Sequence, residues 1–190
     1  MRIVGGKLRG RPLLAPKDLS IRPTADRIRE SIFNILEHGI ESFEIESARV
    51  IDLFAGTGAM GLEALSRGAS FCLFVDDSAE ARGLIRSNAE SLGLTGQTRL
   101  YRRDATHLGP TSAGIFDLAF LDPPYGKRLA ETALVELCDG GWLSAGAVIA
   151  VEEEVDAFKD VPTGYDLADR RRYGGTEITF LRSLGRGDAE

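Results

Sequence analysis

Residues 52–61 read Asp-Leu-Phe-Ala-Gly-Thr-Gly-Ala-Met-Gly, and this stretch decides the fold class. It joins an apolar run, 49–54, to an amphipathic stretch, 59–67, so it predicts a strand, a tight turn and a helix. Glycines suit a backbone that turns sharply and lets a ligand approach closely. The spacing Gly-x-Gly-x-x-Gly is shared with dinucleotide-binding folds. It therefore predicts a ligand-binding α/β unit without identifying the ligand.

Apolar and amphipathic stretches alternate beyond this turn. Further strands are expected at 70–76, 97–103, 115–121 and 146–152, and further helices near 78–92 and 127–138. Thr24 is a candidate N-cap for a helix before the first strand. Gly174-Gly175 is a two-residue hairpin signal between 165–173 and 176–182. The prediction is an α/β fold with a mostly parallel seven-stranded sheet, helices on both faces and a C-terminal antiparallel hairpin.

The length and composition predict one domain. With 190 residues and 43% apolar content, the chain can bury a single core. No apolar run approaches the roughly 20 residues that cross a bilayer, so we expect a cytoplasmic protein without a membrane partner. Within the domain we expect a basic extension at 1–23, a core at 24–182 and a flexible tail at 183–190.

The cysteines and histidines give no support for a metal site. Cys72 lies in an apolar run and Cys138 near the end of an expected helix, which favours reduced thiols over a disulfide. His38 and His107 are far apart, with no ligand spacing around either. We therefore expect no metal.

The charge is distributed unevenly along the chain. Residues 1–30 hold eight Lys or Arg against three Asp or Glu, although the net charge is −6. A basic arm on an acidic body indicates contact with phosphates through one face, and a solvated basic tail would give the same pattern. Gly5-Gly6 could turn the arm into a small β-hairpin. The candidate RNA-binding residues are Arg2, Lys7, Arg9, Arg11 and Arg22.

Acidic residues stand at the carboxyl ends of three successive expected strands. They are Asp52, Asp76 and Asp104. Ligands of open α/β sheets bind at this edge. Asp52 would repel a pyrophosphate but suits a ligand with an ammonium and a sulfonium, whereas Asp76 could accept from ribose and Asp104 from an adenine amino group. The set favours S-adenosylmethionine over NAD, although any single acid could be a helix cap or a loop residue.

The most specific signal is Asp122-Pro123-Pro124-Tyr125, which follows the fourth expected strand. The lone pair of a base amino group is delocalised, so the amine is a poor nucleophile until its hydrogens are held. The Asp122 carboxylate and the Pro123 carbonyl could accept those two hydrogens, and the prolines stiffen the loop. Tyr125 could stack on an extruded base, worth on the order of 1–3 kcal/mol. The motif predicts methyl transfer to a base amine, although alone it could be a proline-rich surface turn.

These motifs together resemble a known family. The core resembles the Rossmann-like class I methyltransferases, and 122–125 resembles the (Asn/Asp)-Pro-Pro-(Tyr/Phe/Trp) motif of enzymes that methylate amino groups of adenine, guanine or glutamine. Segments 2–6, 9–11, 22–30, 52–68 and 122–125 are similar to the bacterial 16S ribosomal RNA guanine-N2 methyltransferases of the small-subunit methyltransferase D type. The resemblance covers nearly the whole chain.

The resemblance implies a monomeric enzyme that uses S-adenosylmethionine to methylate a guanine N2 in 16S rRNA, free or in a partly assembled 30S subunit. S-adenosylhomocysteine is then the product. The target guanine would be held by Asp122, Pro123, Pro124 and Tyr125. The cofactor-binding residues would be Thr24, Arg27, Asp52, Phe54, Gly56, Gly58, Asp76, Asp77, Asp104 and Ala105.

Some of these assignments need comment. Arg27 could pair with the cofactor carboxylate, and Thr24 is equally explained as a helix cap. Asp76 stands where Glu is more usual, so a water or Asp77 would have to assist it. Asp104 stands where some relatives have Asn.

Three alternatives stay open. A DNA adenine-N6 methyltransferase would commonly need a target-recognition domain, for which the chain has little room. A protein glutamine methyltransferase would more often have Asn at position 122. A non-catalytic RNA-binding module would not need the cofactor turn. The expected chemistry is in-line transfer without a covalent intermediate or a metal, with Asp122 either orienting the amine or also taking its proton.

Overall fold

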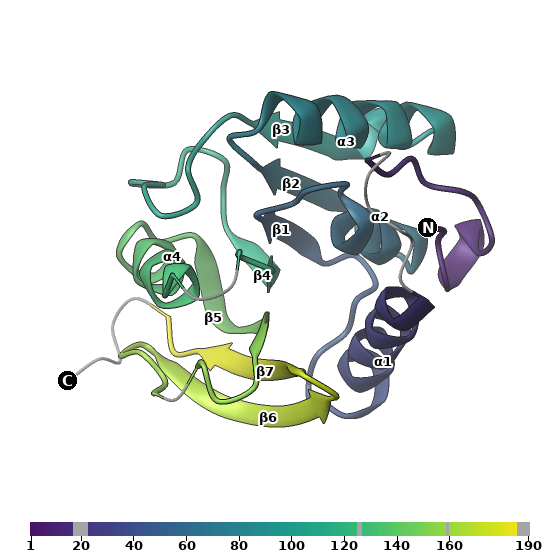
Figure 1. The fold of residues 1–190 in the computed structure, drawn as a ribbon. Coiled ribbons are helices and arrows are strands. Elements are labelled where there is room, and N and C mark those ends of the chain that lie inside the picture. Colours follow the sequence, from purple (N-terminus) through teal and green to yellow (C-terminus); the bar gives the residue numbers. More distant parts are fainter. Residues whose placement is uncertain (17–22, 125–126, 159, 186–190) are drawn as a thin grey trace.

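A seven-stranded sheet forms the centre of the molecule (Figure 1). The computed structural model describes residues 1–16, 23–124, 127–158 and 160–185, with the backbone alone at 23–25. The strand order is β3-β2-β1-β4-β5-β7-β6. The strands are β1 (Arg49–Leu53), β2 (Phe71–Val75), β3 (Thr98–Tyr101), β4 (Phe116–Leu121), β5 (Leu143–Glu154), β6 (Tyr165–Tyr173) and β7 (Thr176–Ser183).

The sheet is mostly parallel. Strands β1 to β5 pair in parallel, whereas β7 runs antiparallel between β5 and β6. The parallel sheet and its closing hairpin confirm the expected fold class. Because β1 to β5 share one direction, their carboxyl ends meet at one edge of the sheet, where ligands of such folds bind.

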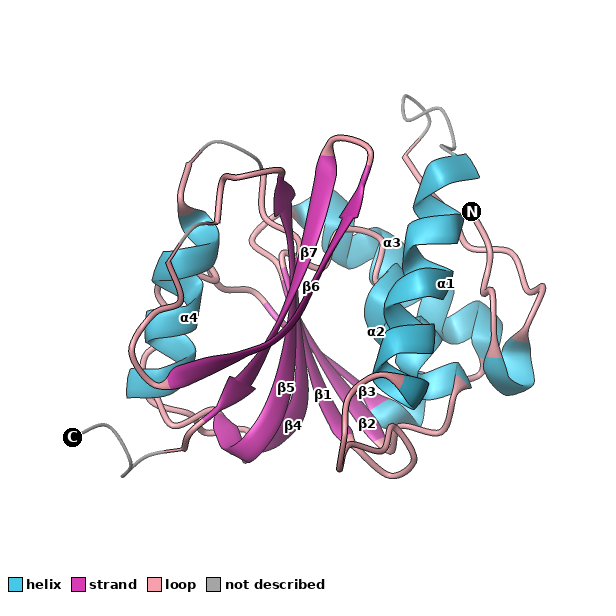
Figure 2. Cartoon of the chain, turned by 90° about the horizontal axis from the view of Figure 1, so that it is seen from below, coloured by secondary structure: helices cyan, strands magenta, loops and turns pink. Residues whose placement is uncertain are grey.

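Helices cover both faces of the sheet, as expected (Figure 2). They are α1 (Pro23–His38), α2 (Ala59–Ser66), α3 (Ala79–Leu92) and α4 (Leu129–Asp139). The first three lie on one face and α4 on the other. Alternate residues of each strand point to opposite faces, so Val50 packs under α1 to α3 while Ile51 packs in the core beneath α4.

Local signals explain both ends of α3 and the start of α1. The Ser78 hydroxyl accepts from the Ala81 N–H at 3.3 Å and caps α3, which ends at Gly93 with a positive φ of 72°. The expectation that Thr24 caps the first helix is wrong, because α1 begins at Pro23 and Thr24 is its second residue. A proline suits the first turn, where its missing N–H would have no helical partner.

The N-terminal arm, defined here as residues 1–13, folds back antiparallel to itself. The Ile3 N–H donates to the Arg11 carbonyl at 3.0 Å, and an isolated bridge joins Arg2 to Pro12. The expected hairpin-like arm is therefore present, but its turn is a short 3-10 helix, η1 (Gly6–Leu8), and the expected turn at Gly5-Gly6 is wrong. The glycines are needed instead for packing, because a Cβ on Gly6 would lie 2.1 Å from the Ser66 carbonyl oxygen of α2.

The C-terminal end stays ordered further than expected. Ser183 is the last residue of β7, and the Leu184 N–H donates to the Gly164 carbonyl at 2.9 Å. The rest of the expected tail, 186–190, lies outside the described residues. Among the helices of the described residues, none is long and apolar enough to cross a membrane.

Candidate active site

A cavity of about 250 Å³ opens at the carboxyl edge of β1 and β4. Its lining comes from α1, the turn after β1, the start of α2, and the ends of β4 and β5. The structure brings four of the expected residues to this cavity: Asp52, Phe54, Gly56 and Asp122. Apolar walls are supplied by Ile28, Ile32 and Met60. The cavity thus combines a glycine turn, acidic groups and flat apolar surface.

The turn after β1 has an unusual backbone. Phe54 and Gly56 have positive φ values of 56° and 55°, and Gly58 has 75°. A positive φ is costly for phenylalanine, and such strain gathers at ligand-binding turns. Gly61 has no room for a side chain, since a Cβ there would lie 2.4 Å from Cys72 Sγ. The glycine at position 61 therefore lets α2 pack closely against β2.

Asp52 is the buried carboxyl of this cavity. Its Oδ2 accepts from the Gly61 N–H at 2.9 Å, which ties the end of β1 to α2. Burial raises the pKa of Asp52 to about 8, Asp76 acts in the same direction, and the Gly61 bond opposes them. Near neutral pH the carboxyl is therefore largely protonated until a cation enters. An ammonium group would favour its ionised form, whereas a pyrophosphate would not.

Asp76 links the second strand to the glycine turn. One carboxylate oxygen accepts from the Gly56 N–H at 2.9 Å and the other from the Ser78 N–H at 2.8 Å. Each carboxylate oxygen keeps capacity for a further hydrogen bond. The side chain therefore lies where it could accept from ribose hydroxyls at the rim of the turn.

The other expected adenosine residues do not line the described cavity. Asp77 is exposed. Asp104 Oδ1 accepts from the Thr106 hydroxyl at 2.6 Å and from its N–H at 2.8 Å, and these bonds lower the pKa of Asp104. Ala105 is buried in the core beneath α4. In the described structure Asp104 orders its own turn.

Asp122 and Pro123 follow β4 directly. Asp122 opens to the cavity, Pro123 is buried and Pro124 is exposed, whereas Tyr125 lies outside the described residues. Loss of hydration raises the pKa of Asp122 well above its ordinary value, and the charges of Glu152, Asp52 and Glu153 add to this. Because the side chain faces the open cavity, solvent screens part of the repulsion. A carboxyl with a raised pKa is suited to accept a proton.

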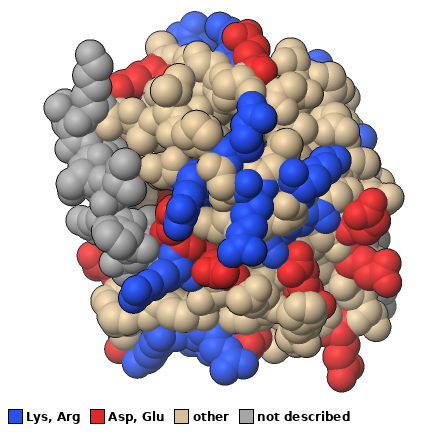
Figure 3. Space-filling model, turned by 90° about the vertical axis from the view of Figure 1, so that its right-hand side faces the viewer, with Lys and Arg blue, Asp and Glu red and all other residues tan. Residues whose placement is uncertain are grey.

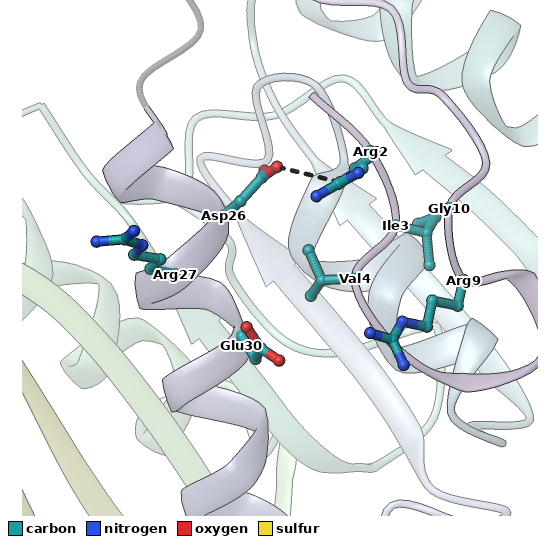
Figure 4. A pocket seen from close by; sticks show the side chains of 8 residues that line it. All are labelled: Arg2, Ile3, Val4, Arg9, Gly10, Asp26, Arg27 and Glu30. Atoms are coloured by element: carbon teal, nitrogen blue, oxygen red, sulfur yellow. Dashed lines mark ion pairs between the residues drawn. The ribbon is translucent and has the colours of Figure 1, made fainter.

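Arg27 lies at a second cavity rather than at the first. This second cavity, of about 440 Å³, lies between the N-terminal arm and α1, and Arg27 lines it with Arg2 and Arg9. In Figure 4, Asp26 and Glu30 project from α1 towards the arm, and Arg2 pairs with Asp26 at 3.9 Å. Thr24 is in the first turn of α1, and its side chain lies outside the described part of the chain.

Arg29, which sequence reasoning missed, lines the first cavity instead. Its side chain is 4% exposed, and its Nη2 donates to Asp26 at 2.7 Å and to the Arg2 carbonyl at 2.6 Å. One helical residue corresponds to a rotation of about 100°, so Arg27 and Arg29 cannot share one side of the helix. Which of the two arginines faces the first cavity depends on the rotation of α1 about its axis, and the local sequence does not fix this rotation.

Glu63 is a second missed residue and holds the N-terminal arm in place. Its buried carboxylate accepts from the N–H groups of Val4 at 2.8 Å and Gly5 at 2.7 Å. Arg67 Nε donates to it at 2.9 Å, and Arg29 Nε lies 3.7 Å away. One sequence signal could have identified it, namely a single acidic residue in the otherwise apolar helix Ala-Met-Gly-Leu-Glu-Ala-Leu-Ser. The arm is thus docked through a buried network.

Basic side chains gather on the face that carries the arm (Figure 3). Arg2 is 70% exposed at its side chain. The exposed arm cations, which we name as a set, are Arg2, Lys7, Arg9 and Arg11. Arg22 lies outside the described residues. A docked segment presents these charges in a fixed arrangement, which a free tail would not do.

Metal ligands do not gather anywhere in the described residues: no group of three His, Cys, Asp or Glu could hold an ion. Cys72 and Cys138 are both free thiols. The lining of the first cavity offers carboxylates, the Arg29 guanidinium, backbone groups and apolar walls.

A strained glycine turn after β1, acids at neighbouring strand ends and a mostly parallel sheet define a Rossmann-like class I methyltransferase fold. A solved structure described as "Putative methyltransferase yhhF from Escherichia coli" matches with a TM-score of 0.83 at 33% identity, covering 98% of this chain and 99% of that one. Residues 1–182 match the family described as "Conserved hypothetical protein 95".

Two curated relatives narrow the family. "Ribosomal RNA small subunit methyltransferase D" of Escherichia coli (strain K12) is 34% identical, covering 100% of this chain and 93% of the relative. "Putative rRNA methyltransferase YlbH" of Bacillus subtilis (strain 168) is also 34% identical, covering 97% of this chain and all of the relative. The chain belongs to the small-subunit methyltransferase D family, and the resemblance seen in its motifs is confirmed.

Proposed function

We propose that the protein is an S-adenosylmethionine-dependent methyltransferase that modifies the N2 amino group of a guanine in 16S rRNA. The observation that carries the proposal is the opening of Asp122 into the cavity that Asp52 and the glycine turn also line. The target-binding motif and the cofactor motif therefore face one space. Relatives named as rRNA methyltransferases support RNA as the substrate class.

The cavity fits the charge pattern of the proposed cofactor. Asp52, with its pKa raised by burial, would ionise against an ammonium group, and Asp76 would accept from ribose hydroxyls at the neighbouring strand end. Asp77, Asp104 and Ala105 would border the adenosine half. The cofactor supplies an already activated methyl group, so the protein has mainly to align the two reactants.

The target amine would be held at the Asp-Pro-Pro turn. Asp122 and the Pro123 carbonyl would accept the two N2 hydrogens and turn the nitrogen lone pair towards the methyl group, and Tyr125 would stack on the base. The nitrogen would then be aligned to take the methyl group that the bound cofactor would supply, with the thioether product as the leaving group. Asp122 can take the amine proton because its raised pKa makes its ionised form a better base.

The basic face would bind the RNA around the target. Two of the arm cations, Arg2 and Arg9, line the second cavity, and Arg27 adds a further charge at its wall. Guanidinium groups pair well with phosphates, so this face suits the RNA backbone. Free 16S rRNA or a partly assembled 30S subunit would be the partner, and the protein would act as a cytoplasmic monomer.

The proposal is tested by incubating the protein with labelled S-adenosylmethionine and four substrates: naked rRNA, assembled 30S particles, DNA and a release factor. We expect label in one of the RNA-containing samples. Label in DNA would favour the adenine-N6 alternative, and label in the release factor would favour the glutamine alternative. Binding of RNA without methyl transfer to any of the four substrates would favour the alternative of a non-catalytic RNA-binding module.

A further inference from the structure

We propose that Glu152 recognises the Watson–Crick edge of the target base and makes the site selective for guanine. The assignment rests on the proposed function, because it names the group that selects the base at the same site. Glu152 is at the end of β5 and lines both the 250 Å³ cavity and a small adjoining pocket. Asp122 lines the same two spaces.

The sheet register places Glu152 beside Asp122. Leu121 of β4 pairs with Val151 of β5 in parallel, so the residues that follow them, Asp122 just beyond β4 and Glu152 within β5, lie side by side. Each follows a residue of the core under α1 to α3 by two positions, Phe120 and Ala150 respectively. Both carboxylates therefore project to the same side of the sheet. The two carboxylates also repel each other, and the Glu152 charge helps raise the pKa of Asp122.

The walls around the two carboxylates are apolar and suit a flat ring. Ile32 of α1, Met60 of α2 and Ile178 of β7 border the small pocket beside Asp122 and Glu152. Ile178 is the direct partner of Glu152 in the antiparallel pairing of β5 and β7. A base entering here would have apolar contacts at its faces and carboxylates at its edge, which is how extruded bases are bound.

Guanine is the base whose edge fits two carboxylates. It presents N1–H beside its N2 amino group, and both are donors. If Asp122 and the Pro123 carbonyl hold the N2 hydrogens, the adjacent N1–H needs a second acceptor, which Glu152 provides. Adenine presents a lone pair at N1, so the Glu152 carboxylate would face another acceptor and repel it.

Two other charged side chains of the lining, Asp52 and Arg29, are held in place by their own contacts. Asp52 accepts from the Gly61 N–H beneath α2, and Arg29 is held by Asp26 and Glu63. Glu153, the next residue on β5, is buried on the opposite side of the strand, because neighbouring residues alternate in direction. The acceptor role of Glu152 therefore rests on its position beside Asp122 in the lining of both spaces.

The test uses an RNA in which the guanosine methylated by the wild-type protein is replaced with 2-aminopurine riboside. This base keeps the 2-amino group but has a lone pair at N1. Single-turnover methylation of the two RNAs is compared for the wild type, Glu152→Gln and Glu154→Gln. Glu154 is a matched control, because it is exposed two residues further along the same side of β5 and does not line the described cavities.

We expect the wild type to prefer guanine by roughly 10–150-fold, the range of one hydrogen bond to a charged group. Glu152→Gln should narrow this preference, with faster methylation of 2-aminopurine than in the wild type, because the amide can donate to N1. Glu154→Gln should keep the wild-type preference. A purely structural role for Glu152 would not produce a gain on the analogue.

Equal wild-type rates on the two bases would overturn the assignment, and so would an unchanged preference in Glu152→Gln. Loss of transfer to both bases in Glu152→Gln, with S-adenosylhomocysteine binding retained, would also overturn it. Failure of the proposed function is recognised separately, because the wild type would then form no N2-methylguanosine in unmodified RNA, before any variant is compared.

Discussion

Replacing Glu63 with Gln should loosen the N-terminal arm and destabilise the whole domain. The carboxylate is fully buried and accepts from two arm N–H groups as well as from Arg67. Gln keeps the shape but removes the charge and turns an NH₂ group towards these donors. Breaking a buried ion pair by changing one partner costs about 3–5 kcal/mol. Arg67 also pairs with Glu37, and Arg29 with Asp26, so we expect the lower half of that range.

The loss of stability can be measured by thermal and urea unfolding, with hydrogen exchange to locate it. A domain of this size loses roughly 2–4 °C in Tm per kcal/mol, so we expect a fall on the order of 10 °C. Exchange should rise first at the Val4 and Gly5 amides. Glu37→Gln is the control, because it touches the same Arg67 from a more exposed position and should cost at most about 1 kcal/mol. Equal stability losses in the two variants would refute the reasoning that Glu63 anchors the arm.

Three further predictions concern binding. Asp76→Ala should weaken S-adenosylhomocysteine binding without unfolding the protein, since the ribose loses an acceptor; calorimetry giving the wild-type affinity would contradict this. The affinity for S-adenosylhomocysteine should rise from pH 6 to about pH 8, because Asp52 must ionise against the ammonium and its pKa in the empty cavity is about 8. Above that pH the affinity should level off. An affinity that does not change with pH would mean that Asp52 does not pair with the ammonium group. Replacing the four arm cations with Ala should weaken RNA binding and flatten its salt dependence while cofactor affinity stays unchanged. An unaltered salt slope would mean that these cations do not contact phosphates.

The regular parts of the fold could be predicted because their signals are local. Burial on both faces makes the parallel strands near-continuous apolar runs, and the expected strand at 49–54 differs from β1 (Arg49–Leu53) by a single residue. Ser78 and Gly93 bound α3 through chemistry that lies within a few residues of each end. Asp52, Phe54, Gly56 and Asp122 meet in one cavity because parallel strands share a carboxyl edge.

The missed features depend on contacts between distant segments. Gly5-Gly6 has the composition of a tight turn, but its close approach to α2 is set by Ser66 and Glu63, about 60 residues away. Glu152 reaches Asp122 only through the pairing of β4 with β5. Neither the rotation of a helix nor a strand pairing across 30 residues can be read from local periodicity.

Product analysis tests whether Asp122 holds a guanine amine for methyl transfer. The nucleosides of 16S rRNA are separated and identified by mass spectrometry after single-turnover reaction with the wild type and with Asp122→Ala. We expect one N2-methylguanosine per RNA from the wild type. For the variant we expect a rate lower by at least about two orders of magnitude, with near-normal binding of RNA and S-adenosylhomocysteine. Methylation of another base, or an Asp122→Ala protein that methylates at the wild-type rate, would contradict it.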